Sequence, residues 1–155
     1  MAAQMTLALK ERGVPLLINQ LRYSMLDRRA ENCFDLAEEQ GFGIIAFSPL
    51  EQGILTGKYN KGIPPGSRAS DKNAYLQSRF DQNKVNKVIE LEIIAAELGT
   101  SMATLALSWL LRSKNVCSVL AGASTIEQIE QNHNAVSFNN FSDDTLKKIE
   151  AVISA

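Results

Sequence analysis

Hydrophobic positions along the chain form two alternating kinds of segment. Short, nearly continuous apolar runs occupy residues 14–19, 43–47 and 116–122. Runs of this length that contain β-branched residues predict strands, and their continuous apolar character is typical of strands covered on both faces of a parallel sheet. Around these runs, apolar residues recur every three or four positions among charged ones, which predicts amphipathic helices.

The segments with helical periodicity lie, in chain order, at 2–13, 29–40, 85–99, 101–111, 124–132 and 142–154. Gly41 follows the second of them and is predicted to end it in a left-handed conformation. Ser101 and Ser142 stand where N-cap residues are expected, and Thr125 and Gln128 have the spacing of a capping box. The stripe of the 101–111 helix leaves Leu105 and Trp109 outside it, so this helix is expected to be covered on more than one side.

The predicted order of elements is α-β-α-β-loop-α-α-β-α-α, which indicates an α/β fold with parallel strands. The loop from about 48 to 80 has no long periodicity, and its segment "NKGIPPGSRAS" (60–70) is rich in proline, glycine and serine. Loops of this length are uncommon in compact domains and are often functional.

Composition narrows the classes of function. The 155 residues suit a single domain, and the net charge of -1 disfavours an extended nucleic-acid or anionic-membrane surface. No apolar stretch approaches the roughly 18 residues of a membrane span, and the start lacks the order of a signal peptide. Cys33 and Cys117 lack paired-ligand spacing, so we expect buried, reduced thiols in a cytoplasmic protein and neither a disulfide nor a metal site.

Candidate chemistry lies where two strands give way to helices. "FSPLEQG" follows the strand at 43–47 and "GASTIEQIEQN" follows the strand at 116–122. Ligands of α/β folds sit at the carboxyl ends of strands. Gly122 lets the backbone approach a ligand closely, while Ser124 and the first amides of the following helix could bind an anion.

Each of these signals also has a structural explanation. A capped helix after a strand needs no ligand, and Lys58 and Arg68 would more often be solvated surface charges. Gln20, at the end of the first strand, needs a partner for its amide, and a structural hydrogen bond would supply one.

Four segments in order, "INQLRYSMLDR" (18–28), "AFSPLEQGILTGKY" (46–59), "GIPPGSRAS" (62–70) and "VLAGASTIEQIEQN" (119–132), resemble the carboxyl-terminal half of an aldo-keto reductase. The similarity is greatest to the branch that holds bacterial L-glyceraldehyde 3-phosphate reductases and the β subunits of voltage-gated potassium channels. The resemblance implies a nicotinamide-dependent (β/α)8 barrel that reduces carbonyls, usually with NADPH. Residues 1–155 would then be the carboxyl-terminal portion of one barrel domain, with cofactor-binding loops at 47–70 and 119–132.

The resemblance also implies a cofactor-binding set. Gln20 would bind the nicotinamide carboxamide, Phe47 would pack on the nicotinamide ring, and Lys58 and Arg68 would clasp the cofactor, Arg68 through the 2′-phosphate. The residues expected along the pyrophosphate are Ser48, Pro49, Leu50, Glu51, Gln52 and Gly53. Those expected at the adenosine end are Gly122, Ser124, Gln128, Gln131 and Asn132.

No catalytic residue is assigned, because the family's Asp, Tyr, Lys and His come from strands of the amino-terminal half. His133 is predicted to be a surface residue, and Tyr23 and Tyr59 to serve packing. The expected function is therefore that of the NADP(H)-binding half of a reductase for small carbonyl substrates, inactive alone. The alternative is a non-catalytic dinucleotide-binding or regulatory module like the channel β subunits. Two open sheet edges would favour either a homo-oligomer or a complementing amino-terminal half.

Overall fold

The computed structural model describes residues 2–67, 69–70 and 81–155. Three parallel strands form one sheet in the order of the sequence: β1 (Ile18–Arg22), β2 (Gly43–Phe47) and β3 (Val116–Leu120). β2 is central; Gln20 of β1 pairs with Ile45, which pairs on its other side with Ser118 of β3. The predicted α/β order with parallel strands is confirmed.

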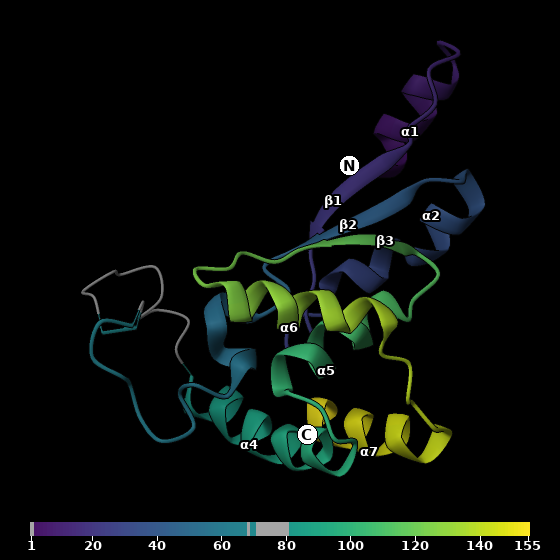
Figure 1. The fold of residues 1–155 in the computed structure, drawn as a ribbon. Helices are drawn as coiled ribbons and strands as arrows, with labels where there is room; N and C mark the ends of the chain where they lie inside the picture. The colour runs from purple at the N-terminus through teal and green to yellow at the C-terminus, as the bar shows by residue number, and fades with distance from the viewer. Residues whose placement is uncertain (1, 68, 71–80) are drawn as a thin grey trace.

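Helices cover one side of this sheet (Figure 1). The helical elements are α1 (Ala2–Lys10), the 3₁₀ helix η1 (Arg29–Cys33), α2 (Phe34–Gln40), the 3₁₀ segment η2 (Glu51–Thr56), α4 (Gln82–Glu97), α5 (Met102–Leu111), α6 (Ile126–Ser137) and α7 (Asp143–Ser154). α5 packs against β3 and α6, and α4 packs against α5 and α7. α1 projects away from the sheet at the amino end of β1.

Local sequence sets the predicted helix ends. The hydroxyls of Ser101 and Ser142 each accept a hydrogen bond of 3.1 Å from the backbone N–H three residues later, as N-caps do. Gly41 ends α2 with φ of 74°, a left-handed conformation that glycine adopts without strain from a Cβ atom. The predicted 29–40 helix is divided into η1 and α2, while α6 extends beyond the predicted 124–132.

The strand prediction at 14–19 was wrong. β1 begins only at Ile18, and Val14 and Leu17 are largely exposed. Pro15 within the apolar run has no N–H to donate to a ladder, which explains why this part of the run does not pair. The strand predicted at 116–122 ends at Leu120, and that predicted at 43–47 is confirmed with its bounds.

The expectation that the strands are covered on both faces was also wrong for the described chain. Ile44 and Ala46 are fully buried against the helices. Side chains of the opposite face, such as Ile45 and Phe47, are only half-buried, and Leu120 is exposed. In the part of the chain that the structure describes, no strand pairs with the outer edges of β1 and β3. A closed barrel would place this uncovered face inside.

The core is centred on α5, whose residues from Met102 to Leu110 are all buried. Trp109 is fully buried and lies between aromatic and cationic groups. The ring centroid of Tyr23 is 6.0 Å from it, and the guanidinium of Arg112 is 4.6 Å from its ring. The expectation that this helix is covered on more than one side, and that Tyr23 serves packing, is confirmed.

The two cysteines differ from expectation. Cys33 is half-buried and Cys117 is exposed, although both are free thiols. Cys117 lies beside the irregularity between Ile44 and Ile45 in the β2–β3 register, and its Sγ is 3.3 Å from the carbonyl oxygen of Ile44. An apolar run predicts a strand, but it does not tell which face of that strand is covered.

No single helix in the described ranges is both long and apolar enough to cross a membrane. α4 and α5 meet that criterion only when taken together, and they are bent by 88° at the break between them.

The backbone of Gly41 provides a test of the fold. A Cβ atom at Gly41 would meet no neighbour within 4 Å, so Gly41→Ala isolates the cost of the left-handed conformation. We expect this variant to lose about 1 kcal/mol of unfolding free energy in urea titrations. Gly122→Ala is the matched control, because Gly122 also has open space around it but no positive φ; its change should stay within about 0.5 kcal/mol. Equal losses in both variants would contradict this account.

Tyr23 predicts a stability change at alkaline pH. Burial, and then the hydrogen bond that its hydroxyl donates to Glu31 at 2.8 Å, raise the pKa of Tyr23 well above its usual value of about 10. The contribution of the neutral Tyr23 hydroxyl to the free energy of unfolding is therefore complete below pH of about 10. It is lost as the pH rises further, by up to about 1.4 kcal/mol per pH unit. Tyr23→Phe lacks the hydroxyl, so the free energies of unfolding of the two proteins, measured in urea at each pH, should converge above pH of about 10. A constant difference between the variants at every pH would contradict the prediction.

Candidate functional site

The candidate site lies at the carboxyl edge of the sheet. Because β1, β2 and β3 are parallel, the loops that follow β2 and β3 leave the sheet at the same edge, on the left in Figure 1. The two loops therefore face one region of the molecule, as the sequence pattern predicted.

Gln20 and Phe47 share the uncovered face, but only Phe47 ends its strand at this edge; Gln20, expected at the end of its strand, lies two residues before the end of β1. Gln20 pairs with Ile45, and Phe47 pairs with Arg22 and Leu120, so the two side chains lie on the same face of neighbouring strands. Gln20 is exposed and Phe47 is half-buried. The arrangement offers an aromatic surface with an amide close to it, which suits a flat heterocycle that carries a polar substituent.

The loop after β2 has an unusual backbone. Ser48, Glu51 and Gln52 have φ of 54°, 47° and 58°, a region that residues with a side chain seldom adopt. The amides of Glu51 and Gly53 donate to the carbonyls of Ser48 and Leu50 at 3.1 and 2.8 Å. These two main-chain donors are therefore bonded within the turn itself, which differs from the expectation of a row of donors directed at a pyrophosphate.

Apolar residues fix both ends of this loop to the core. Pro49 is buried and Leu50 packs against the main hydrophobic cluster. Ile54 and Leu55 are fully buried in the same cluster. The polar turn between them is thereby held at the sheet edge.

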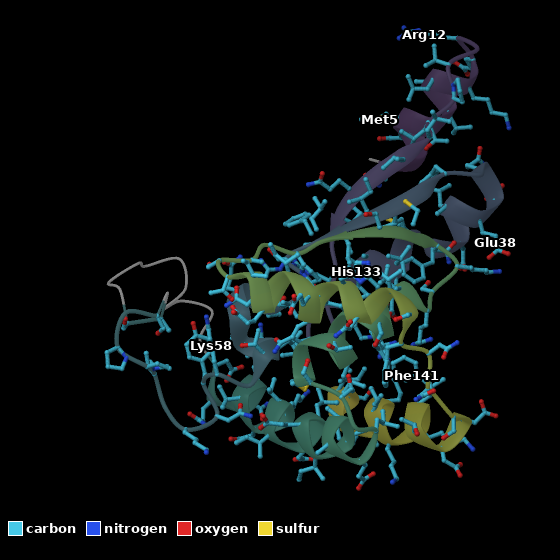
Figure 2. The ribbon with its side chains drawn as sticks, viewed as in Figure 1. Met5, Arg12, Glu38, Lys58, His133 and Phe141 are labelled. Carbon is cyan, nitrogen blue, oxygen red and sulfur yellow. The ribbon has the colours of Figure 1, made fainter. Side chains whose placement is uncertain are left out.

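Lys58 lies over the turn at Gly53. A Cβ atom added to Gly53 would be 2.7 Å from Cε and Nζ of Lys58, so the absence of a side chain makes room for this cation. The Nζ atom also lies 4.9 Å from the centroid of the Tyr59 ring, at cation–π distance. Lys58 is exposed and labelled in Figure 2. It places a positive charge at the edge where an anion was predicted.

Glu51 points into the protein. Its carboxylate is 1% exposed and accepts hydrogen bonds from Arg22 Nη2 at 2.7 Å and from Ser24 Oγ at 3.0 Å. Arg22 also bridges to Asp27 through Nε at 3.0 Å. Asp27 is also paired with Arg29, whose hydrogen bond lowers the pKa of Asp27. The carboxylates of Glu51 and Asp27 thus both have cationic partners. The sequence expectation placed Glu51 along the pyrophosphate, whereas its side chain is occupied here.

The loop after β3 is capped by its own side chains. Thr125 Oγ1 accepts from the backbone N–H of Gln128 at 3.3 Å, and Gln128 Oε1 accepts from the backbone N–H of Ser124 at 2.7 Å. The carboxylate of Glu127 bonds its own backbone N–H and Thr125, which lowers the pKa of Glu127. A ligand anion at the start of α6 would therefore have to displace Gln128 or Glu127.

The other residues predicted at this end are accessible. Gly122 is exposed with open space around it, and Gln131 is exposed while Asn132 is half-buried. The backbone carbonyl of Gln131 accepts a hydrogen bond from Thr104, which ties α6 to α5. His133, labelled in Figure 2, is exposed on the same helix as expected.

Arg68 lies outside the described residues, but its neighbour Ser67 is informative. The hydroxyl of Ser67 is buried and has no hydrogen-bond partner among the described residues. A buried hydroxyl without a partner is unusual and suits a polar ligand group. Sequence analysis did not select Ser67, because a serine in a turn-rich segment carries no signal of its own. Arg22 was missed as well, since its partner Glu51 is 29 positions away.

The described residues contain no group of three or more His, Cys, Asp or Glu side chains that could hold a metal ion. Tyr59 is buried, in accord with a packing role.

Comparison with known proteins gives a consistent result. The model of the Aldo/keto reductase family matches residues 1–154. The chain is 40% identical over 152 residues to proteins named L-glyceraldehyde 3-phosphate reductase in Escherichia coli O157:H7 and in Escherichia coli K12; in each case 94% of this chain and 44% of the relative are covered. It is 36% identical over 140 residues to a putative voltage-gated potassium channel subunit beta of Schizosaccharomyces pombe. This match covers 87% of this chain and 41% of that protein. The chain thus spans less than half the length of these relatives.

Proposed function

Because this chain belongs to the aldo/keto reductase family, we propose that it binds NADPH for the reduction of small aldehydes or ketones to alcohols. The family fold is a (β/α)8 barrel, of which the described chain has three parallel strands with flanking helices. The observation that carries the proposal is the convergence of Phe47 and the two loops on one sheet edge, with Gln20 on the same face two residues before the end of β1.

The side chains at this edge fit a nicotinamide dinucleotide. Phe47 provides the surface on which the nicotinamide ring packs, and Gln20 provides an amide for its carboxamide. Lys58 brings a positive charge to the turn that the diphosphate would approach. When bound, the cofactor would supply the hydride; the residues of this chain would bind and orient it.

The preference for NADPH over NADH is assigned to the segment at 67–68. Arg68 has the charge and the planar donor geometry to bind a 2′-phosphate in a bidentate manner. The buried hydroxyl of Ser67 beside it, which has no hydrogen-bond partner among the described residues, supports a polar ligand group at this place.

The substrate class follows from the names of the relatives. Two of them are named L-glyceraldehyde 3-phosphate reductase, so we propose a small aldehyde such as glyceraldehyde 3-phosphate or methylglyoxal. No residue of this chain is assigned to proton transfer, and we expect it to be inactive alone, in a cytoplasmic setting. The uncovered sheet face and unpaired β1 and β3 edges favour packing against a further part of the barrel or another copy of the chain.

A second candidate is a non-catalytic dinucleotide-binding or regulatory module. It is favoured by the similarity to a putative potassium channel β subunit and by the packing roles of Tyr23 and Tyr59, which leave no described tyrosine at the site. Binding without turnover agrees with both candidates, so complementation with the remaining strands is the experiment that separates them.

Cofactor binding can be measured by the fluorescence of NADPH. We expect the unmodified chain to bind, and Lys58→Ala to weaken binding about tenfold, because a hydrogen bond to a charged group is lost. Phe47→Ala should weaken both NADPH and NADH, whereas Arg68→Ala should weaken NADPH alone. His133→Ala, an exposed change on α6, is the control and should leave the affinity unchanged. The absence of binding at millimolar NADPH would contradict the proposal.

Turnover provides an independent test. The chain alone, mixed with NADPH and glyceraldehyde or methylglyoxal, should not consume NADPH measurably, since it has no assigned proton donor. Addition of a polypeptide that carries the other five strands should restore consumption if the first candidate is right. Turnover by the isolated chain would show that the assignment of no catalytic residue is wrong.

A further inference from the structure

Glu51 is a charged side chain buried inside the loop that is proposed to meet the cofactor. It is 1% exposed, and its carboxylate is surrounded by donors from the rest of the chain. Oε2 is 2.7 Å from Arg22 Nη2 and 3.7 Å from Lys84 Nζ, while Oε1 accepts from Ser24 Oγ at 3.0 Å. Neither oxygen is left for a ligand.

The three partners of Glu51 belong to three different places in the fold. Arg22 is the last residue of β1, Ser24 follows it before η1, and Lys84 lies in the first turn of α4. The carboxylate therefore ties the loop after β2 to the end of the neighbouring strand and to a helix.

The same turn has an unfavourable backbone conformation. Ser48, Glu51 and Gln52 all have positive φ although none is glycine. Residues in such conformations persist only where the surrounding structure determines them, and they are concentrated at ligand-binding sites. Glu51 is one of these residues, and its side chain is bonded to groups outside the turn.

Stability alone is a weak reason for this arrangement. The free energy lost when two charges are removed from water offsets much of the free energy gained from their attraction. Well-packed apolar residues of similar volume often stabilise a protein as much as a buried ion pair, or more. A buried carboxylate that is bonded to fixed groups does restrict the loop, because a different arrangement would have to find new partners for the buried charge.

We propose that Glu51 is a positioning residue that holds the 48–57 loop in its cofactor-ready conformation before the dinucleotide binds. The inference rests on the proposed function and adds a residue whose effect on the cofactor is indirect. Affinity is gained because the loop does not have to be ordered at the moment of binding. Gly53, which lies in that loop, and Lys58, which follows it directly, are then presented in a fixed relation to the edge that holds Phe47.

The substitution Glu51→Gln tests the proposal while it keeps the shape of the side chain. Arg22 keeps its bridge to Asp27 in this variant, so no arginine is left without a carboxylate. Asp27→Asn is the matched control: it also removes one negative charge that is bonded to Arg22, but among the described residues Asp27 pairs with Arg22 and Arg29 and not with the loop.

The first readout needs no cofactor. Hydrogen exchange of the amides of Glu51, Gly53 and Leu55, which donate to carbonyls within the turn, reports how well the loop is held. In the full chain without NADPH, we expect these amides to exchange at least about tenfold faster in Glu51→Gln and at an unchanged rate in Asp27→Asn. Equal rates in the unmodified chain and Glu51→Gln would overturn the proposal, whatever the chain binds.

The second readout is the dissociation constant for NADPH, which we expect to rise about tenfold in Glu51→Gln and to stay within about twofold in Asp27→Asn. An equal loss of NADPH affinity in both variants would mean that the negative charge near Arg22 matters and the bonds between Glu51 and its partners do not. That result would overturn the proposal. If the unmodified chain itself fails to bind NADPH, the proposed function fails, and faster exchange in Glu51→Gln alone would still show that Glu51 holds the loop. Ser24→Ala, which removes the neutral donor to Glu51 together with the acceptor of the Leu26 N–H, replaces Glu51→Gln if that variant does not fold.

Discussion

The parallel pairing of β2 with both of its neighbours is the constraint on which the rest of the molecule depends. It joins Gln20, Ile45 and Ser118 in one row across the sheet and brings the loops after β2 and β3 to one edge. The two-residue period of the strands then separates a face packed on helices from a face without cover. The candidate site is the place where that uncovered face meets the shared edge. Its position therefore follows from backbone hydrogen bonds between the strands and not from the side chains of the site residues.

Local chemistry made part of this fold predictable. Ser101, Ser142 and Gly41 end or begin helices through bonds to residues at most four positions away, so the sequence contains the whole cause. β1 was misplaced because the prediction followed the apolar run and gave no weight to Pro15, while the register of the strand depends on its pairing with β2. Cys117 was expected to be buried, and its exposure depends on what covers a sheet face, which is a property of the whole assembly of strands.

The candidate site was predictable in position but not in orientation. The resemblance selected Glu51 and the main-chain donors around it, yet the direction of its carboxylate depends on Arg22, 29 positions earlier. The positive φ values at Ser48 and Gln52 depend in the same way on contacts outside the turn. At α6, the side chains of Gln128 and Glu127 take the places that a helix N-terminus otherwise offers to an anion. Periodicity and motif spacing do not show whether a side chain of the protein or a ligand anion occupies the backbone N–H groups at the start of a helix.

These contacts change the electrostatic account of the site. A carboxylate directed outward from the turn would repel a diphosphate at the same edge. Burial of Glu51 against Arg22, with Lys84 nearby, compensates that charge within the protein. Lys58, which has the opposite sign, is exposed and lies over Gly53, where the proposed dinucleotide would meet it. In the proposed complex, recognition of the diphosphate would therefore depend on this side-chain cation more than on a row of backbone amides, because the amides of Glu51 and Gly53 are already bonded within the turn.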